Sequence, residues 1–371
     1  MRVGIPKESR PGEARVAIVP DALPKLSRLG LEVLIERGAG VASGFGDSDY
    51  EAKGAQLASS EEVLGTGLVL AFDSPDPGSM KPGTVLICSP NPLGQPELIA
   101  KLAQEKVTCL ALELMPRISR AQAMDVLSSM ANIGGYKAVL VAAARSAKMF
   151  PLMMTAAGTV RPAKVFVLGA GVAGLQAIAT ARRLGAVVEA YDIRSDTKEQ
   201  VESLGARFVE FDLGAGDAQD EGGYAKELTD EQKKLQAELM AAQIQAADVV
   251  ITTAQVPGRR APVLIPASVV EGMKSGAVIV DMAADSGGNC ELTVAGEEVE
   301  KHGVTLIGIS NLPATVQQSA SQLYANNLIN YLGQLVVDGE LKLDLNDEVV
   351  RVPLVCHEGE VTNARVKEGL S

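Results

Sequence analysis

The chain has 371 residues, 47% of them hydrophobic, and carries 34 basic and 46 acidic residues for a formal net charge of −12. This length favours two domains, and the apolar content excludes a disordered chain. The negative charge, with no Lys/Arg-rich tract against it, argues against nucleic acid as a partner.

The N-terminus reaches Pro6 and several charges within ten positions, so it lacks the apolar stretch of a signal peptide. Continuous apolar runs, such as residues 138–144, are far shorter than the roughly 18 residues of a membrane helix, so we expect a soluble chain. The cysteines are widely spaced and only two histidines are present, which predicts reduced thiols in a cytoplasmic setting and no metal site. The four cysteines are Cys88, Cys109, Cys290 and Cys356.

Short runs rich in Val, Ile and Leu alternate with helix-length segments from the N-terminus onward. Continuous apolar strands separated by helices indicate a parallel sheet that is covered on both faces. The first series predicts strands at 2–5, 32–35, 67–72, 84–88 and 108–112, with helices at 23–29 and 96–105.

A second series of the same kind follows a segment rich in Ala, Ser and Met, residues 119–148, which we interpret as a helix linking two domains. Its strands are predicted at 164–168, 187–191, 207–210, 248–252, 277–281 and 305–308.

The last segment of the chain is predicted to return to the first domain. A helix at 317–332 precedes two apolar segments, 336–345 and 349–354, which we interpret as a hairpin turning on Asn346-Asp347. The prediction is an α/β protein of two doubly wound, Rossmann-like parallel-sheet domains, the first discontinuous and ending in a β-hairpin. The first domain comprises residues 1–130 and 316–371, and the second comprises 131–315.

The sequence Val165-Phe-Val-Leu-Gly169-Ala-Gly171-Val-Ala-Gly174 matches the dinucleotide-binding pattern G-x-G-x-x-G. A predicted strand precedes it and a helix at 175–184 follows it. Gly169 permits the tight turn, Gly171 lets a pyrophosphate approach the backbone, and Gly174 lets helix and strand pack closely. The helix N-terminus supplies N–H groups to the anion.

Asp192 ends the next strand, where an acid accepts ribose hydroxyls and repels a 2′-phosphate. This position favours NAD(H) over NADP(H). An arginine just past that strand, Arg194, is able to pair with a 2′-phosphate, but we interpret it as a solvated surface charge.

A group of polar side chains follows the strand at 108–112, beside the predicted crevice between the domains. It includes Arg117, Gln122, Asp125, Ser128 and Ser129. Ligands bind at such sheet ends, so the group is a candidate site. Its spacing puts Gln122, Asp125 and Ser129 on one helix face, and the alternative is helix capping with a surface ion pair.

Two further segments belong to the predicted cofactor region. Residues 212–225 are too polar and Gly-rich for a core, so they are either a mobile lid carrying Tyr224 or a surface insertion. Thr253, Ala254 and Gln255 follow the strand at 248–252, where backbone and hydroxyl groups can reach a dinucleotide.

These motifs together resemble the NAD(H)-binding component, domain I, of proton-translocating nicotinamide nucleotide transhydrogenase, over nearly the whole chain. In the loop after the fifth strand, this chain differs from the family's usual sequence at Gln255, Val256, Arg259 and Arg260. This difference leaves the role of the Gln255 side chain open. The resemblance rests on Pro6-Lys-Glu8, Arg15-Val-Ala, Pro116-Arg-Ile-Ser-Arg-Ala-Gln122, Leu127-Ser-Ser-Met-Ala-Asn-Ile-Gly-Gly-Tyr136, Thr155-Ala-Ala-Gly158, the glycine motif, Lys198-Glu-Gln-Val201, Gly222-Gly-Tyr-Ala-Lys226 and Gly287-Gly-Asn-Cys290.

The resemblance implies that Arg117, Gln122, Asp125 and Ser128 surround the nicotinamide, with Gln122 near the point of hydride transfer. It also implies that Tyr224 closes over bound nucleotide. With the motifs above, the NAD(H)-binding candidates are Gly169, Gly171, Val172, Gly174, Asp192, Ile193, Arg194, Gly223, Tyr224, Thr253, Ala254 and Gln255.

The same resemblance implies direct hydride transfer between NADH and NADP⁺ held on a separate NADP(H)-binding component. A membrane proton-channel component would couple this reaction to proton translocation. The chain would be a homodimer in the cytoplasm, peripheral on the inner membrane through its partner subunits.

The main alternative is an amino-acid dehydrogenase similar to alanine dehydrogenase, which shares the N-terminal motifs. That enzyme carries a substrate-binding lysine and a catalytic histidine at positions that align here with Ala71 or Asp73, and with Asn91. Oxidising an amino acid needs a base and a cation for the carboxylate, and both are missing here. His302 and His357 are interpreted as surface residues. A saccharopine-type dehydrogenase and a non-catalytic NAD sensor stay open as further alternatives.

Overall fold

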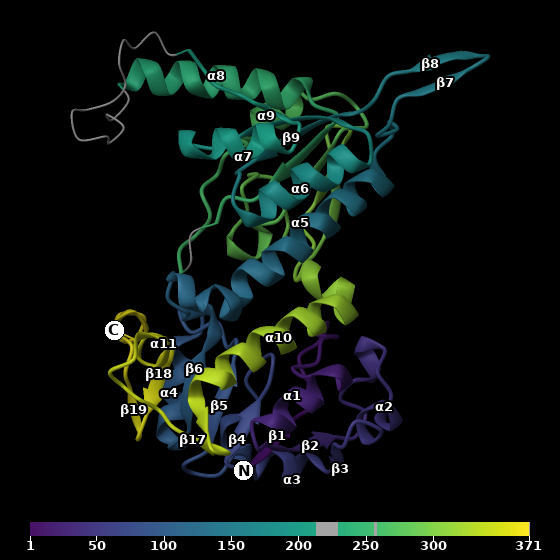
Figure 1. The fold of residues 1–371 in the computed structure, drawn as a ribbon. Helices are drawn as coiled ribbons and strands as arrows, with labels where there is room; N and C mark the ends of the chain where they lie inside the picture. The colour runs from purple at the N-terminus through teal and green to yellow at the C-terminus, as the bar shows by residue number, and fades with distance from the viewer. Residues whose placement is uncertain (213–228, 256–257, 371) are drawn as a thin grey trace. The chain divides into compact units, whose positions relative to one another are not determined.

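The computed structural model describes residues 1–212, 229–255 and 258–370, and the chain forms two compact units. Unit 1 contains Met1–Ala131 and Pro313–Ser371, and unit 2 contains Asn132–Leu312. Each unit is built on one large, mostly parallel sheet with helices packed against it (Figure 1). The predicted fold class, α/β with Rossmann-like parallel sheets, is confirmed.

The sheet of unit 1 has eight strands among the described residues, in the order β19-β18-β6-β5-β4-β1-β2-β3. The six strands from β1 to β6 pair in parallel, whereas β18 runs antiparallel to β6 and β19 runs antiparallel to β18. The strands are β1 (Arg2–Ile5), β2 (Glu32–Glu36), β3 (Gln56–Ala58), β4 (Leu68–Leu70), β5 (Val85–Cys88), β6 (Thr108–Ala111), β18 (Leu354–His357) and β19 (Glu360–Val361).

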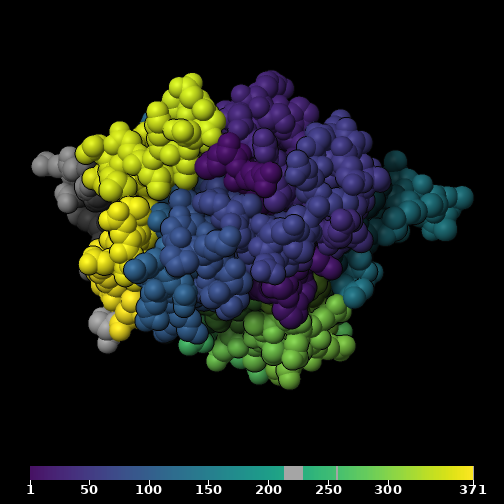
Figure 2. All heavy atoms as spheres, turned by 90° about the horizontal axis from the view of Figure 1, so that it is seen from below, coloured from purple at the N-terminus to yellow at the C-terminus, as the bar shows by residue number. Residues whose placement is uncertain are grey.

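Helices cover both faces of this sheet, which is why its strands are apolar on both sides. On one face, α1 (Leu23–Arg28), α10 (Gln317–Leu335) and α11 (Glu348–Arg351) pack against strand residues such as Ile5. On the other, α4 (Pro96–Gln104) and α12 (Ala364–Glu368) pack against residues such as Leu86. Two short helices, α2 (Asp47–Glu51) and α3 (Ser60–Leu64), precede β3 and β4. Figure 2 shows the yellow C-terminal residues lying against the blue segment that contains α4.

The predicted hairpin on Asn346-Asp347 is wrong. The sequence predicts a strand at 349–354, but Asp347 caps the helix α11, its side chain accepting a hydrogen bond from the N–H of Val349. The helix is favoured over a strand because it buries Val349 and Val350 together in the core of unit 1. Two shorter hairpins occur instead, β16 (Val336–Val337) with β17 (Glu340–Leu341), and β18 with β19.

Among the described residues of unit 2, the sheet has seven strands in the order β11-β10-β9-β12-β13-β15-β14, and only β14 runs antiparallel. The chain enters the sheet at β9, and its later strands are added on the two sides of β9 through β10 and β12. A crevice at the carboxyl ends of such strands is where doubly wound folds bind ligands. The strands are β9 (Lys164–Leu168), β10 (Val187–Tyr191), β11 (Arg207–Phe208), β12 (Val249–Thr252), β13 (Val278–Asp281), β14 (Glu298–Lys301) and β15 (Val304–Ile307).

The helices of unit 2 form two layers around this sheet. On one face, α5 (Val126–Arg145), α6 (Val172–Arg183) and α7 (Lys198–Ser203) contribute to a core with Val165 and Val167. On the other, α8 (Asp230–Ala246) and α9 (Ala267–Glu271) pack against Phe166 and Leu168. The four cysteine thiols of the chain are free and buried.

The linking segment, predicted as one helix over 119–148, is broken into two pieces. A 3-10 helix spans Ser119–Met124, Asp125 is extended, and α5 begins at Val126. By length and composition alone, α5 is apolar enough to cross a membrane. Its residues Ala138, Val139 and Ala142 are buried in the core of unit 2, and 39% of its apolar window is buried.

A two-stranded hairpin extends from unit 2. It consists of β7 (Met153–Thr155) and β8 (Gly158–Val160), paired only with each other. Figure 1 shows it projecting away from the sheet of its own unit. All six strand residues are exposed, including three large apolar ones.

Candidate functional site

The glycine motif forms the turn between β9 and α6, and two of its glycines are required by close contacts. Gly169 has φ +99°, which other residues rarely adopt, and a Cβ there would lie 2.4 Å from Thr253 Oγ1. A Cβ on Gly174 would lie 1.9 Å from the carbonyl oxygen of Gly169. A side chain at Gly174 would therefore push α6 away from the end of β9, and one at Gly169 would displace the loop that carries Thr253.

The first turn of α6 has N–H groups without a side-chain acceptor. Gly171 is the N-cap of α6 and offers none, because it has no side chain. A Cβ built on Gly171 would meet no atom within 4 Å, so the space in front of this helix end is open. Backbone N–H groups and the helix dipole then face that space together, which suits a pyrophosphate. Val172, the first residue of the helix, is exposed beside it.

Asp192 follows β10 and has all of its acceptor positions engaged. Its Oδ2 accepts hydrogen bonds from the N–H of Ala170 at 2.7 Å and from Arg194 Nη2 at 3.0 Å. Its Oδ1 accepts from the N–H of Arg194 at 2.9 Å and from Arg194 Nε at 3.0 Å. Burial by itself raises the pKa of this carboxyl, but the hydrogen bonds from Arg194 and Ala170 hold its pKa below the usual value.

Arg194 lies at the surface, with its side chain 56% exposed, and it has an acidic partner. Its guanidinium forms a two-bond ion pair with Asp192, because the two residues flank a tight turn that brings their side chains to the same side. Between them, the side chain of Ile193 is 88% exposed, an unusual environment for a large apolar residue. An apolar surface next to the carboxylate suits a planar base that follows the ribose.

The loop after β12 is joined to the glycine turn through Thr253. Its Oγ1 donates hydrogen bonds to the carbonyl oxygens of Leu168 and Gly169, at 3.1 and 3.2 Å. The side chain of Gln255 donates to the carbonyl oxygen of Met282 at 2.8 Å, which gives this departure from the family pattern a structural partner.

The buried side chains of Asn289 and Asp281 hold Ala254, the next residue of that loop, in place. Neither side chain was assigned a role from the sequence. Asn289 is fully buried, accepts a hydrogen bond from the N–H of Ala254, and donates to the carbonyl oxygens of Ala254 and Pro262. Asp281, at the end of β13, in turn accepts from the N–H groups of Asn289 and Cys290 and from Thr252 Oγ1. An acid ending an apolar strand, and an Asn after two glycines, were the sequence features that could have pointed to them.

The polar group after β6 belongs to unit 1 and is organised around Asp125. Its carboxylate accepts hydrogen bonds from the N–H and the hydroxyl of Ser128, at 2.9 and 2.6 Å, which is helix capping at the start of α5. Gln122 lies on the preceding 3-10 helix, so the prediction that Gln122, Asp125 and Ser129 share one helix face is wrong. The extended backbone at Asp125 separates them. Arg117 and Gln122 are exposed.

Other contacts within unit 1 hold this polar segment in place. Arg120 pairs with Asp347 at the start of α11, with Nη1 3.0 Å from Oδ2. Asn327 on α10 donates a hydrogen bond to the carbonyl oxygen of Ala123 at 2.8 Å. The segment that carries Arg117 and Gln122 is therefore anchored on two helices, while those two side chains stay accessible.

Asp73 and Asn91, at the positions of the alternative amino-acid site, and the nearby Arg15 have partners of their own. The buried guanidinium of Arg15 is held by Glu13, with Nε 2.6 Å from Oε1, and lies 3.4 Å from the centre of the Phe72 ring. Asp73 pairs with Arg10, and the N–H of Asn91 donates to Glu113. The Arg15 guanidinium is therefore neutralised by Glu13.

Some predicted features lie outside the described residues. These are Gly223 and Tyr224 of the predicted lid, with most of the stretch 212–225, and also Val256 and Pro257. Within the described residues, no group of three or more His, Cys, Asp or Glu side chains is placed to hold a metal ion.

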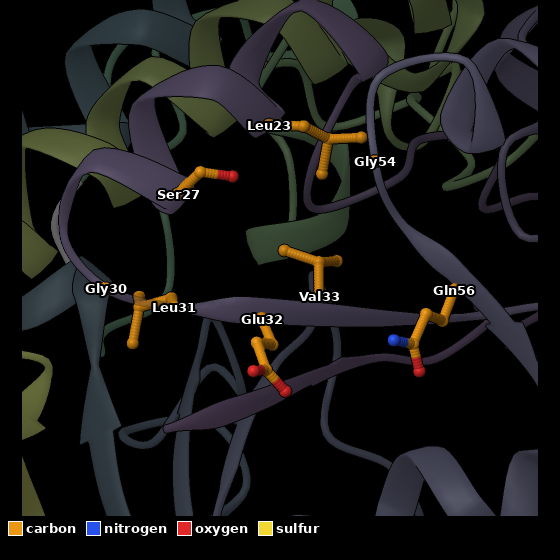
Figure 3. A pocket seen from close by; sticks show the side chains of 8 residues that line it. All are labelled: Leu23, Ser27, Gly30, Leu31, Glu32, Val33, Gly54 and Gln56. Atoms are coloured by element: carbon orange, nitrogen blue, oxygen red, sulfur yellow. The ribbon is translucent and has the colours of Figure 1, made fainter.

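A hollow of about 420 Å³ lies elsewhere in unit 1, between α1 and the starts of β2 and β3 (Figure 3). Glu32 and Gln56 begin those strands, so this hollow is at the amino ends of the strands rather than at the carboxyl ends. It contains none of the predicted site residues. Its lining residues are Leu23, Ser27, Gly30, Leu31, Glu32, Val33, Gly54 and Gln56.

Comparisons with known proteins agree with the folds of both units. The family model for the N-terminal domain of alanine dehydrogenase/PNT matches residues 4–134, and the model for the C-terminal domain matches residues 138–364. The chain is 47% identical to an NAD(P) transhydrogenase subunit alpha protein of Rhodospirillum rubrum, covering 98% of each chain.

Two further relatives represent the transhydrogenase and the alanine dehydrogenase branches of the family. A crystal structure of transhydrogenase from Sinorhizobium meliloti superposes with a TM-score of 0.87 at 42% identity, covering 98% of this chain and 99% of that one. Alanine dehydrogenase of Bacillus subtilis is 29% identical, covering 100% of this chain and 95% of that protein. The chain therefore belongs to the alanine dehydrogenase/PNT family, on the branch of NAD(P) transhydrogenase subunit alpha.

Proposed function

We propose that this chain is the NAD(H)-binding component of a proton-translocating transhydrogenase, and that hydride passes directly between its NADH and NADP⁺ on a separate component. One observation carries the proposal. The open N-terminus of α6 and the Asp192 carboxylate follow neighbouring parallel strands, β9 and β10, so one dinucleotide can reach both. The membership of the chain in the transhydrogenase branch supports the same conclusion.

The residues of unit 2 would bind and orient the nucleotide. The N–H groups at the start of α6 would bind the pyrophosphate, Asp192 the adenosine ribose, and Ile193 would contact the adenine. The loop at Thr253 and Ala254, held by Asn289, would line the crevice on the side of β12. Bound NADH supplies the hydride, and the protein needs only to hold two nicotinamides in contact and exclude water.

The residues of unit 1 would act at the nicotinamide end. Arg117 and Gln122 are exposed on an anchored segment, and Asp125 with Ser128 forms the fixed start of α5. We place all four around the nicotinamide, with Gln122 near the point of hydride transfer. Their role is to position the ring, since hydride transfer between two nicotinamides needs no general acid or base.

The proposal extends to partners and location. Subunit alpha names one member of a larger assembly, and we assign NADP(H) binding and proton conduction to its other components. The chain would lie in the cytoplasm, peripheral on the inner membrane through them. The exposed β7–β8 hairpin, with Met154 75% exposed, is a candidate homodimer contact. Met154→Asp should then shift the sedimentation coefficient from dimer to monomer, and an unchanged dimer would exclude the hairpin.

The alternative function is an NAD-dependent amino-acid dehydrogenase similar to alanine dehydrogenase. The shared family models and the 29% identity to alanine dehydrogenase of Bacillus subtilis favour it. Against it, Glu13 already neutralises Arg15, and neither Asp73 nor Asn91 supplies the cation and base that the reaction needs.

The test is hydride transfer from NADPH to an NAD⁺ analogue whose reduced form absorbs at a shifted wavelength. The chain is mixed with a purified NADP(H)-binding transhydrogenase component, and each protein is omitted in turn. We expect rapid reduction only in the mixture. Confirmed NADH binding without transfer would reject the role with this partner, and reductive amination of pyruvate by the chain alone would establish the alternative.

A further inference from the structure

The ion pair between Asp192 and Arg194 bears on which nucleotide the site admits. An acid at this position is expected to reject NADP(H) by repelling the 2′-phosphate. That expectation treats the carboxylate as an uncompensated charge. Here the guanidinium lies against it, with Nε and Nη2 each 3.0 Å from a carboxylate oxygen.

The hydrogen-bond geometry shows what a ribose would have to displace. A carboxylate offers about four acceptor positions, and all of those on Asp192 are used. Two are taken by the backbone N–H groups of Ala170 and Arg194, and these hold the carboxylate in place. The other two are taken by the Arg194 guanidinium. Two ribose hydroxyls can therefore bind only if the guanidinium gives up these two bonds.

The side chains of Asp192 and Arg194 differ in how far they are exposed to solvent. The Asp192 side chain is 7% exposed and that of Arg194 is 56% exposed, so the guanidinium is the outer group that an arriving nucleotide meets first. After displacement it stays tethered two residues away, beside the ribose. The other acid near the guanidinium is Asp196, on the following 3-10 turn.

We propose that Arg194 is a specificity-determining residue that weakens the exclusion of NADP(H) from this site. It does so by neutralising Asp192 and offering a cation where a 2′-phosphate would lie. Selection for NADH then rests on the hydrogen-bond geometry of Asp192 and much less on its charge. This inference rests on the proposed function, because it assumes that the nucleotide site is the one at β9 and β10.

The proposal predicts opposite effects from the two members of the pair. In Arg194→Gln, the carboxylates of Asp192 and Asp196 lose their cation, and the ratio of the NADPH to the NADH dissociation constant should rise at least about tenfold. In Asp192→Asn, the guanidinium is released and one negative charge is lost, so the ratio should fall by about tenfold or more. Arg194→Lys keeps the charge and should stay within about threefold of the wild-type ratio.

The experiment titrates the full-length chain with NADH and with NADPH, following nucleotide fluorescence at low and at high salt. The matched control is Arg183→Gln, which removes the same charge at the opposite end of α6 and should leave the ratio unchanged. The effect of Arg194→Gln should shrink at high salt, because the group is half exposed. Circular dichroism confirms that each variant is folded.

The outcomes separate this inference from the proposed function. Wild-type binding of NADH with a raised ratio in Arg194→Gln supports both. Wild-type binding of NADH with an unchanged or lowered ratio in that variant overturns the role of Arg194 and leaves the NADH site standing. A wild-type chain that binds neither nucleotide overturns both.

Discussion

Replacing Gly135 by alanine should separate α5 from α6 at the turn that carries the nucleotide motif. Gly135 lies on α5, and a Cβ built there would be 2.1 Å from the carbonyl oxygen of Ala173, in the first turn of α6. That oxygen belongs to the backbone, so it cannot rotate away. The two helices must therefore move apart by about 1 Å or more to restore an ordinary contact.

The expected magnitude is a difference between two effects. Inside a helix, alanine is favoured over glycine by about 1 kcal/mol. Overpacking of an interior costs about 1–3 kcal/mol, and a clash with backbone belongs at or above the upper end. We expect a net loss of about 2 kcal/mol in the free energy of unfolding. Since the N-terminus of α6 is displaced, the NADH dissociation constant should rise about tenfold.

The matched control is Gly333→Ala on α10. A Cβ at Gly333 would meet nothing within 4 Å, so only the helix preference operates, and the variant should gain about 0.5–1 kcal/mol. Urea unfolding followed by circular dichroism measures both variants, and fluorescence titration measures NADH binding. If Gly135→Ala were as stable as Gly333→Ala and bound NADH normally, the α5–α6 contact would not have the importance we give it.

Two further predictions concern the buried Asn289 and the partly buried Glu8. Asn289→Ala removes the hydrogen-bond partners of two backbone groups on Ala254 and of one on Pro262. It should lower the free energy of unfolding in urea by at least about 2 kcal/mol and weaken NADH binding. A variant as stable as the wild type would contradict this role of Asn289. Burial raises the pKa of Glu8 from 4.5 to about 8, so the folded state holds this proton more tightly than the unfolded state. The contribution of Glu8 to the free energy of unfolding is fully present below pH 4.5 and is lost as the pH rises through 8, and the loss amounts to roughly 2–4 kcal/mol. Glu8→Gln should flatten this dependence between pH 5 and pH 8.5, and an equal slope in both proteins would refute the assignment.

The central strands were predictable because their residues are apolar on both faces. The predicted strands at 164–168 and 187–191 coincide with β9 and β10, since a parallel strand between two helix layers has a continuous apolar sequence. The same criterion predicted a strand after Asp347 and was wrong there, because a short buried helix such as α11 produces a similar apolar pattern. Only packing against the core of unit 1 distinguishes the two.

Within the candidate site, the sequence pointed to the groups whose conformation is local. Gly169 needs a positive φ, and Gly174 must lie close to Gly169, a contact that spans only five residues. Asp281 and Asn289 escaped notice because their partners, Thr252 and Ala254, lie far away in the sequence. Their importance depends on which strands become neighbours.

By itself, then, the sequence determined the α/β class of both units and the nucleotide turn, because apolar periodicity and glycine geometry act over a few residues. Tertiary structure decided the rest. It interrupted the linking segment at Asp125, where α5 begins, and it joined Asp281 to Thr252 and Asn289 to Ala254, contacts between residues far apart in the sequence. Partner choice for a charged side chain depends on distances and burial that only the folded chain sets, because a charge near a low-dielectric interior interacts far more strongly than one in water.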